Sequence, residues 1–189
     1  MDTKRNCVKL VITGNPGVGK HTIAELFIKQ DSSYNIFDIS KFAIEKGFGE
    51  QVDDGIEVDT TKIKNEIKKS DLEKLVIVGH LAPYVLDESD IDIVIILRKN
   101  PYDLIEIYKK RDYQKSKIKQ NTGSEILGII ANDSITSFGK AKSFEVNTTD
   151  KTPEKILKEI DNIIYNQKSG DIVDWLELVE KRDDFDRFF

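Results

Sequence analysis

Residues 14–20, with the sequence GNPGVGK, place glycines and a lysine at a spacing that binds polyphosphate. In such a loop the backbone N–H groups wrap the phosphates, and the helix that follows adds the partial positive charge of its N-terminus. The β-branched run at 8–12 precedes the loop and a helical pattern follows it, which is the order that this chemistry requires. We therefore expect an ATP site in which Gly17, Gly19 and Lys20 contact the phosphates.

The residue after the lysine of such a loop is normally Ser or Thr, whose hydroxyl coordinates magnesium, but here it is His21. Imidazole nitrogen is a poor magnesium ligand. Three alternatives follow: Thr22 takes over, the phosphates and water hold the metal alone, or metal-dependent turnover is weakened. We expect His21 and Thr22 to line the ATP site, with Thr22 as the candidate Mg²⁺ ligand, and we expect binding to survive better than catalysis.

Two more side chains are candidates for handling a phosphoryl group. His80 follows the apolar run 75–78, and ligands of parallel sheets bind at the carboxyl ends of the strands, so His80 could orient a water molecule or an acceptor phosphate. Arg111 carries a guanidinium that holds two oxygens at once, which suits a γ-phosphoryl group in transfer. The alternatives are a structural histidine and a solvated arginine at a helix end.

The elements that must position these residues alternate between strands and helices. The predicted strands cover 8–12, 35–38, 75–78, 91–97 and 143–146, and the helical segments cover 20–28, 40–46 with Ser40 as N-cap, 60–69, 102–138, 152–165 and 172–179. Residues 47–59 are glycine-rich and acidic and predict a mobile loop. The alternation predicts a three-layer α/β fold of the P-loop NTPase class, with a five-stranded parallel sheet and helices on both faces.

Length, charge and cysteine content exclude several classes of protein. The 189 residues favour one domain, and the net charge of -5 argues against a general nucleic-acid clamp. Lysines between 109 and 119 leave two alternatives, a contact with RNA or a solvated helix face. The single cysteine, Cys7, fits a packed side chain in a reducing compartment. The apolar run near the N-terminus is too short for a signal or a membrane span, so we expect a cytoplasmic protein.

Several motifs in order resemble the adenylate kinase-like ATPases of ribosome assembly. They are the GxPGxGK loop, the segment 39–59, the Gly79-His80 turn, Leu97-Arg98 and Arg111-Asp112-Tyr113. The pattern covers residues 7–165 and is most similar to the archaeal branch, the adenylate kinase isoenzyme six-like family. The resemblance implies a P-loop kinase domain at 1–167, with a monophosphate-binding segment at 38–61 and a lid at 109–119, and a helical extension at 168–189.

The same resemblance implies an activity and partners. The expected reaction is phosphoryl transfer from ATP to AMP or another nucleoside monophosphate, giving two ADP in the AMP case. ATPase activity, a function in small-subunit ribosomal RNA maturation and a small-subunit ribosomal protein as partner are implied as well. A short lid predicts leaky hydrolysis, because lid closure excludes water from the site.

The chain departs from the family pattern at two further points. Relatives end the third strand in Asp-x-His, whereas this sequence has Val78-Gly79-His80 and so lacks the carboxylate. Asp38 or an acidic residue of 51–59 is a candidate replacement. Many relatives also carry arginines in the segment corresponding to 41–45 and near position 107, and this chain has none there, which leaves the preferred acceptor open.

These departures keep two rival functions in view. One is an ATP-binding assembly factor with weakened catalysis, and the other is a P-loop kinase of a small metabolite. The tail ends in aromatic residues at 185–189, which predicts that it docks on the domain or on a partner.

Overall fold

The fold is described by a computed structural model for residues 8–52, 55–69 and 72–189, so the prediction for Cys7 lies outside the described residues. The strands are β1 (Leu10–Thr13), β2 (Asn35–Asp38), β3 (Gly49–Val52), β4 (Gly55–Val58), β5 (Leu75–Val78), β6 (Ile93–Arg98) and β7 (Ser143–Asn147). The helices are α1 (Lys20–Gln30), α2 (Ile39–Glu45), α3 (Thr60–Ile67), α4 (Ala82–Val85), α5 (Pro101–Lys110), α6 (Lys115–Ile126), α7 (Ile129–Phe138), α8 (Pro153–Asn166) and α9 (Trp175–Glu180). Two short 3-10 turns lie at Glu88–Asp90 and Phe185–Arg187.

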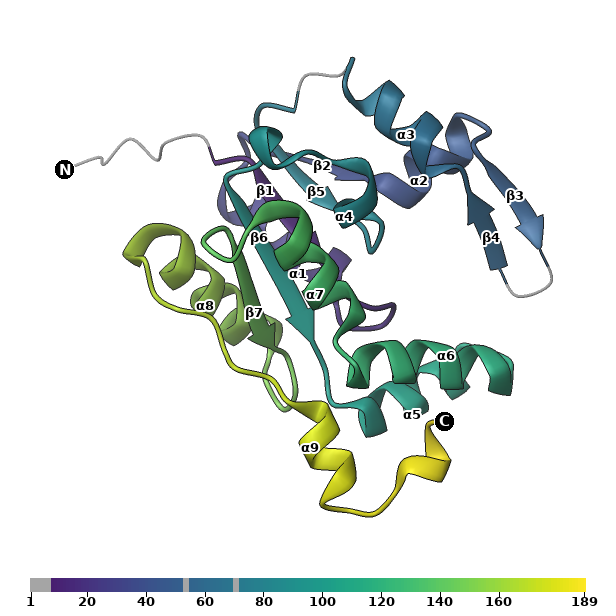
Figure 1. The fold of residues 1–189 in the computed structure, drawn as a ribbon. Coiled ribbons are helices and arrows are strands. Elements are labelled where there is room, and N and C mark those ends of the chain that lie inside the picture. The colour runs from purple at the N-terminus through teal and green to yellow at the C-terminus, as the bar shows by residue number, and fades with distance from the viewer. Residues whose placement is uncertain (1–7, 53–54, 70–71) are drawn as a thin grey trace.

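Five strands form one parallel sheet in the order β2-β5-β1-β6-β7 (Figure 1). The continuous apolar runs of the sequence supply its centre, since β1 and β6 are buried along almost their whole length. The predicted five-stranded parallel sheet of the P-loop class is thereby confirmed. The loop before α1 leaves the carboxyl end of β1, the central strand of the sheet.

Helices cover both faces of the sheet (Figure 1). On one face α1, α5 and α8 pack on the strands, with Ile23, Tyr108 and Ile160 among their buried side chains. On the other face α2, α3, α4 and α7 form a second core that includes Ile39 and Phe138. Successive residues of a strand point to opposite faces, which is why one apolar run feeds both cores.

The C-terminal segment packs on α5 and α6 and closes a third apolar cluster. Trp175, Val179 and Phe188 are buried there against Ile105 and Ile126. The prediction that the aromatic tail docks on the domain is confirmed, although Phe185 and Phe189 keep much of their surface exposed. In Figure 1 the yellow tail lies directly below α5 and α6.

Two local predictions in the first half of the chain were wrong. Residues 47–59 do not form a loop throughout, because β3 and β4 pair as an antiparallel hairpin in which Gly49 faces Val58. The N-cap of α2 is Asp38 and not Ser40, since the Asp38 carboxylate accepts hydrogen bonds from the backbone N–H groups of Ser40 and Lys41 at 2.8 and 3.0 Å.

The C-terminal helix starts later than predicted. It begins at Trp175 because the Asp174 carboxylate caps it and accepts a hydrogen bond from Glu177 N at 2.8 Å, while Ile172 remains 99% exposed. The helical stretch 102–138 is likewise divided, by a turn at 111–114 and by Gly128 with its positive φ of 63°. No helix in the described part of the chain is long and apolar enough to cross a bilayer.

Candidate functional site

The loop between β1 and α1 has the backbone geometry of an anion site. Gly14 has φ 130°, and a Cβ atom at this position would lie 2.3 Å from the carbonyl oxygen of Leu97, so only glycine fits. Gly19 caps α1 with φ 99°, and no side chain described here caps the helix. The first N–H groups of α1 are therefore left for an external anion, which the helix dipole also favours.

Two hydrogen bonds hold the loop and its neighbour in place. The hydroxyl of buried Tyr108, on α5, donates to the carbonyl oxygen of Pro16 at 2.6 Å. The Thr13 hydroxyl at the end of β1 donates to the carbonyl oxygen of Gly79 at 2.9 Å. This second bond fixes the turn that carries His80 beside the loop.

Lys20 folds back over the loop that precedes it. Its ammonium donates to the carbonyl oxygens of Gly14 and Asn15 at 2.8 and 2.9 Å. Burial lowers the pKa of Lys20 to about 8, the negative charges of Asp38 and Glu125 oppose this shift, and the positive charge of Arg111 adds to it. A phosphate group arriving here meets a desolvated cation that needs a new anionic partner.

This lowered pKa predicts how ATP affinity depends on pH. Above pH 8 Lys20 is deprotonated in the free protein, and ATP binding must then take up a proton at Lys20. The ATP dissociation constant should therefore rise up to about tenfold per pH unit. Isothermal titration calorimetry between pH 7.5 and pH 9.5 measures this. Lys20→Arg, whose guanidinium stays charged, should lack the rise, and a constant wild-type affinity up to pH 9.5 would contradict the prediction.

A cavity of about 480 Å³ opens above the loop and gathers the residues that the sequence singled out. Its lining includes Gly17, Gly19, Lys20, His21, Thr22, His80 and Arg111, together with Asp38. The structure therefore brings every predicted site residue to one cavity. Arg111 reaches it from the end of α5, where it is the C-cap residue.

The carboxylate of Asp38 lies next to the end of β5 and lines the cavity. Asp38 ends β2 and pairs in register with Val78, which ends the neighbouring strand β5. The Oδ2 atom of Asp38 accepts a hydrogen bond from His21 Nε2 at 2.5 Å. Burial alone would raise the pKa of Asp38, but hydrogen bonds from His21 and from the Lys41 backbone outweigh burial and hold the pKa below its usual value. Two other acidic candidates of 51–59 have described positions: Asp59 caps α3 instead, and Glu57 is exposed and does not line this cavity.

The donor set of the cavity fits a magnesium ion that arrives with ATP. Thr22 and Asp38 present hard oxygen donors beside Lys20, whereas the His21 nitrogen suits magnesium poorly. Among the residues with described positions, no group of three or more His, Cys, Asp and Glu side chains is placed to hold a metal. The phosphates and water would therefore have to supply most of the ligands.

His80 is neutral in this site at physiological pH. Burial and the positive charge of Lys20 lower its pKa to about 4, against a smaller opposing effect of Asp38. A neutral imidazole offers one donor and one acceptor nitrogen, so His80 can orient a phosphate oxygen or a water molecule but does not act there as a cation.

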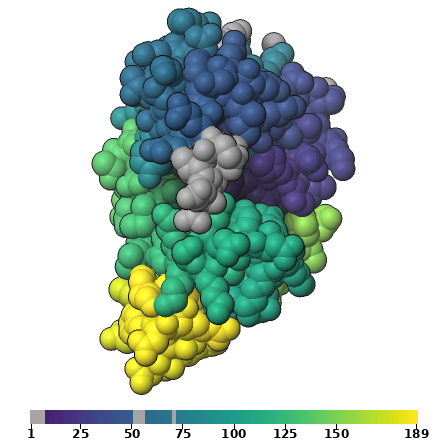
Figure 2. Space-filling model, turned by 90° about the vertical axis from the view of Figure 1, so that its right-hand side faces the viewer, coloured from purple at the N-terminus to yellow at the C-terminus, as the bar shows by residue number. Residues whose placement is uncertain are grey.

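A second cavity of about 730 Å³ adjoins the first and shares Pro16, Ser40 and His80 with it. Its walls include Ser40, Ile44 and Val58 on one side and residues of α6 and α7 on the other. Figure 2 shows the blue part of the chain above the green part. The lining is mixed, with apolar side chains such as Ile44 and polar ones such as Asn121.

Asn121 has an unused hydrogen-bond donor in this second cavity. Its Nδ2 atom is buried, and among the described residues no acceptor lies within hydrogen-bonding distance. Buried polar groups are nearly always paired, so an unpaired amide in a cavity wall is a candidate ligand contact.

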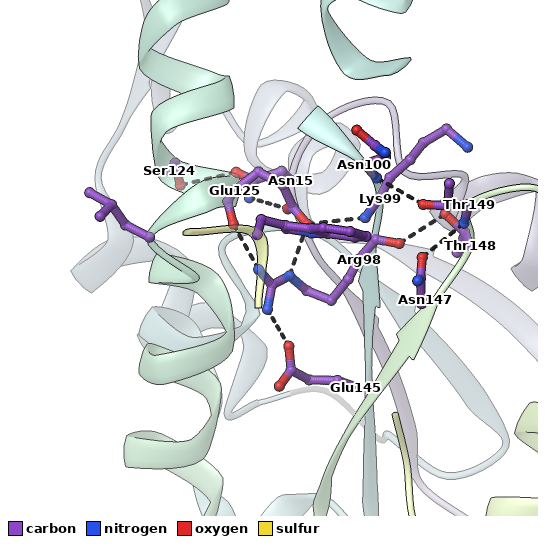
Figure 3. Close-up of polar contacts among 12 residues, drawn as sticks. Asn15, Arg98, Lys99, Asn100, Ser124, Glu125, Glu145, Asn147, Thr148 and Thr149 are labelled. Atoms are coloured by element: carbon purple, nitrogen blue, oxygen red, sulfur yellow. Dashed lines mark hydrogen bonds and ion pairs between the residues drawn. The ribbon is translucent and has the colours of Figure 1, made fainter. Parts of the chain in front are cut away.

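Sequence reasoning missed a buried polar network behind the loop. Figure 3 shows Glu125 of α6 between Asn15 of the loop and Arg98 at the end of β6. Two weak signals in the sequence could have indicated this network. Glu125 is a carboxylate within the apolar end of a helical segment, and Arg98 ends the most apolar strand.

One lysine of the cluster at 109–119 has a structural partner. Lys119 donates a hydrogen bond to the main-chain oxygen of Phe189.

Comparison with known proteins agrees with this geometry. A family model described as an AAA domain matches residues 10–128. A protein of Pyrococcus abyssi named "Putative adenylate kinase" is 35% identical over 178 residues, covering 91% of this chain and 93% of that protein. A protein of the same name from Saccharolobus islandicus is 34% identical over 173 residues, covering 88% of this chain and 87% of that protein.

Among solved structures, a shikimate kinase from Bacteroides thetaiotaomicron superposes with a TM-score of 0.51 at 14% identity, covering 82% of this chain and 97% of that one. At this identity the likeness concerns the fold alone. Together, the matched model and the two archaeal relatives show that the chain belongs to the AAA-domain P-loop family that includes the archaeal proteins named "Putative adenylate kinase".

Proposed function

We propose that the protein is a nucleoside-monophosphate kinase of the adenylate kinase type, which converts ATP and AMP into two ADP. The observation that carries the proposal is the pair of cavities that meet at Pro16, Ser40 and His80, beside the phosphate loop. Two substrates in these cavities would bring their phosphates together at the shared residues. The names of the archaeal relatives support the same reaction.

In this proposal ATP occupies the cavity above the loop. Gly17 and Gly19 would offer backbone N–H groups to the phosphates, and Lys20 would exchange its two carbonyl partners for phosphate oxygens. Mg²⁺ bound with ATP neutralises phosphate charge, and Thr22 and Asp38 are the residues that would hold it.

The monophosphate would occupy the second cavity. One of its phosphate oxygens attacks the γ-phosphorus of ATP, and the bond from that phosphorus to the β–γ bridging oxygen breaks, so that two diphosphates leave. Arg111 would neutralise charge on the moving phosphoryl group, and His80 would orient the attacking phosphate. We assign 38–61 as the monophosphate-binding segment and 109–119 as the lid.

The unpaired amide of Asn121 leads to a prediction about the acceptor. Replacing it by alanine should raise the KM for AMP about tenfold, since a hydrogen bond to the base or ribose in a buried site contributes about 1–3 kcal/mol. The KM for ATP should not change. Asn132→Ala, a change of the same residue type on the exposed side of α7, is the matched control, and an unaltered KM for AMP in Asn121→Ala would remove this residue from the site.

His21 leads to a prediction about magnesium. In His21→Thr the hydroxyl adds an oxygen ligand, and Asp38 loses the hydrogen bond that now occupies its Oδ2, so both groups become available to the cation. We expect magnesium-dependent turnover to rise about tenfold, which corresponds to about 1.4 kcal/mol in the barrier. Initial rates over a magnesium titration measure this. An unchanged rate at every concentration would contradict the prediction, and a lower rate would show that His21 itself serves the reaction.

The proposal extends to ATPase activity and to maturation of small-subunit ribosomal RNA with a small-subunit ribosomal protein as partner. The support for this part is the motif resemblance, together with a lid whose turn spans only 111–114. Release of phosphate from ATP in the absence of AMP tests the ATPase activity. Direct contact with RNA stays a separate prediction from the lysines at 109–119.

Binding experiments test the two-cavity proposal. Calorimetric titration should give one ATP and one AMP per chain, and a compound that joins two adenosines through five phosphates should displace both. ATP binding without AMP binding would contradict the proposal and favour a kinase of a small metabolite.

The second candidate function is an ATP-dependent assembly factor with slow turnover. The observation that favours it is the His21–Asp38 hydrogen bond, which occupies a carboxylate where a magnesium ligand is needed. Tight ATP binding with no product from ATP, with or without AMP, would support this function.

A further inference from the structure

The carboxylate of Glu125 joins three distant parts of the chain inside the protein (Figure 3). Glu125 has no exposed surface, and its Oε2 accepts a hydrogen bond from Asn15 Nδ2 of the phosphate loop at 2.7 Å. Its Oε1 accepts from Arg98 Nε at 2.8 Å and from the Lys99 backbone at 3.0 Å. Trp175 is the first residue of α9, and its Nε1 donates a hydrogen bond to the same Oε1 at 3.0 Å.

The contacts form a continuous path from the C-terminal segment to the phosphate loop. Trp175 contacts Glu125, Glu125 contacts Asn15, and the carbonyl oxygen of Asn15 accepts a hydrogen bond from Lys20 at 2.9 Å. Asn15 is further held by the Ser124 hydroxyl, which donates to its Oδ1 at 3.1 Å. Every link is a hydrogen bond between groups that are buried or partly buried, where such bonds are stronger than in water.

We propose that Glu125 is a positioning residue for the nucleotide site, and that docking of α9 through Trp175 sets the shape of the phosphate loop through it. This inference rests on the proposed binding of ATP at that loop. It makes the segment 168–189 a part of the nucleotide site and not a separate appendage.

The physical reason lies in how one carboxylate is shared. Donors from Arg98, Lys99 and Trp175 converge on Oε1 and fix the rotation of the group, which aims Oε2 at Asn15. Removing the Trp175 N–H takes one of these constraints away and lets the carboxylate turn. Asn15 would then lose its fixed position, and Lys20 would lose the carbonyl that holds it ready for phosphate.

Trp175 is the one tryptophan of the sequence, so tryptophan fluorescence reports on its hydrogen bond to Glu125. Its indole is 8% exposed and bonds to the charged carboxylate, so a change in that bond alters its emission. ATP binding at the loop should shift the emission of Trp175 by way of Asn15 and Glu125. In Asn15→Ala, ATP should still bind, more weakly, but without this shift.

Affinity measurements separate positioning from general stability. Trp175→Phe keeps an aromatic ring in the apolar cluster but removes the N–H, and we expect its ATP dissociation constant to rise about fivefold. Because Trp175 and Asn15 act through the same carboxylate, the double variant Trp175→Phe with Asn15→Ala should bind ATP hardly worse than Asn15→Ala alone.

Two control variants match these changes. Glu159→Gln weakens a partly buried carboxylate–lysine pair with Lys151 outside this path, and it should lower stability without altering ATP affinity. Glu177→Gln alters an exposed carboxylate of α9 and should alter neither.

The experiment distinguishes failure of this inference from failure of the proposed function. A wild-type protein that does not bind ATP would overturn both. A wild-type protein that binds ATP with no change in Trp175 emission, a folded Trp175→Phe variant with wild-type affinity, or additive effects in the double variant would overturn only the inference. The emission measurement needs no substitution, so it decides the matter even where a variant does not fold.

Discussion

Lys20→Ala is expected to weaken ATP binding at least tenfold, or about 1.4 kcal/mol, and to reduce turnover further. Lys20 is the buried cation of the loop, and its present partners are two backbone carbonyls that a phosphate replaces. Its loss removes one positive partner of the terminal phosphates both before and during transfer. Calorimetry with ATP gives the affinity, and initial rates give the turnover.

The matched control for this variant is Lys29→Ala, which removes an exposed lysine from the last turn of the same helix. It should bind ATP as the wild type does. Wild-type affinity in Lys20→Ala would mean that the loop is not the ATP site, and the assignment of both cavities would then fail.

Arg111→Ala is expected to lower kcat on the order of a hundredfold with little change in the KM for ATP. The reason is that Arg111 lines the cavity at the end of α5, where its guanidinium can follow charge that develops only as the phosphoryl group moves. Arg111→Lys should recover part of the rate, because it keeps the charge but loses the two-pronged geometry.

Lys110→Ala is the control for Arg111→Ala, since Lys110 is the exposed neighbour that ends α5. We expect wild-type rates from it. An Arg111→Ala variant with a raised KM and an unchanged kcat would show that this arginine holds the bound nucleotide and does not act on the transition state.

Local sequence patterns were sufficient to predict the centre of the fold. The strand, glycine loop and helix around residues 10–30 follow from contiguous residues, and the apolar runs at 75–78 and 91–97 predict buried strands, which the structure shows at 75–78 and 93–98. Since parallel strands need crossover helices, the order of the elements then fixed the class of fold. The site residues Lys20 and His80 met in one cavity because this class gathers strand ends and the loops after them at one edge, and Arg111 joins them from the C-terminal end of α5.

The features that sequence reasoning missed depend on pairs far apart in the chain. Asn15 and Glu125 are separated by 110 positions, and Glu125 and Trp175 by 50, so no window of sequence contains either pair. The hairpin of β3 and β4 was missed for another reason. Its strands pair only with each other and bear glycine and charge, which are weak strand formers, so composition favoured a loop.

The position of Asp38 shows how a known fold could refine such predictions. The absence of a carboxylate at the end of β5 was visible in the sequence, and the candidate replacement, Asp38, lies on the adjacent strand β2 in register with Val78. Strand order is needed to see that these two positions are neighbours. The family pattern has Ser or Thr where this chain has His21, and Asp where it has Val78. Asp38 lies beside Val78 and accepts a hydrogen bond from His21, so both departures meet at Asp38.

The most direct test of the proposed function is a product assay of the purified protein with ATP and magnesium, with and without AMP, in which ATP, ADP and free phosphate are followed separately. A nucleoside-monophosphate kinase predicts that AMP adds ADP formation at twice the rate of the accompanying ATP loss, beyond the one ADP and one phosphate per ATP that ATPase activity releases without AMP. Phosphate release that AMP does not affect, with one ADP for each ATP consumed, would contradict it and leave the protein an ATPase.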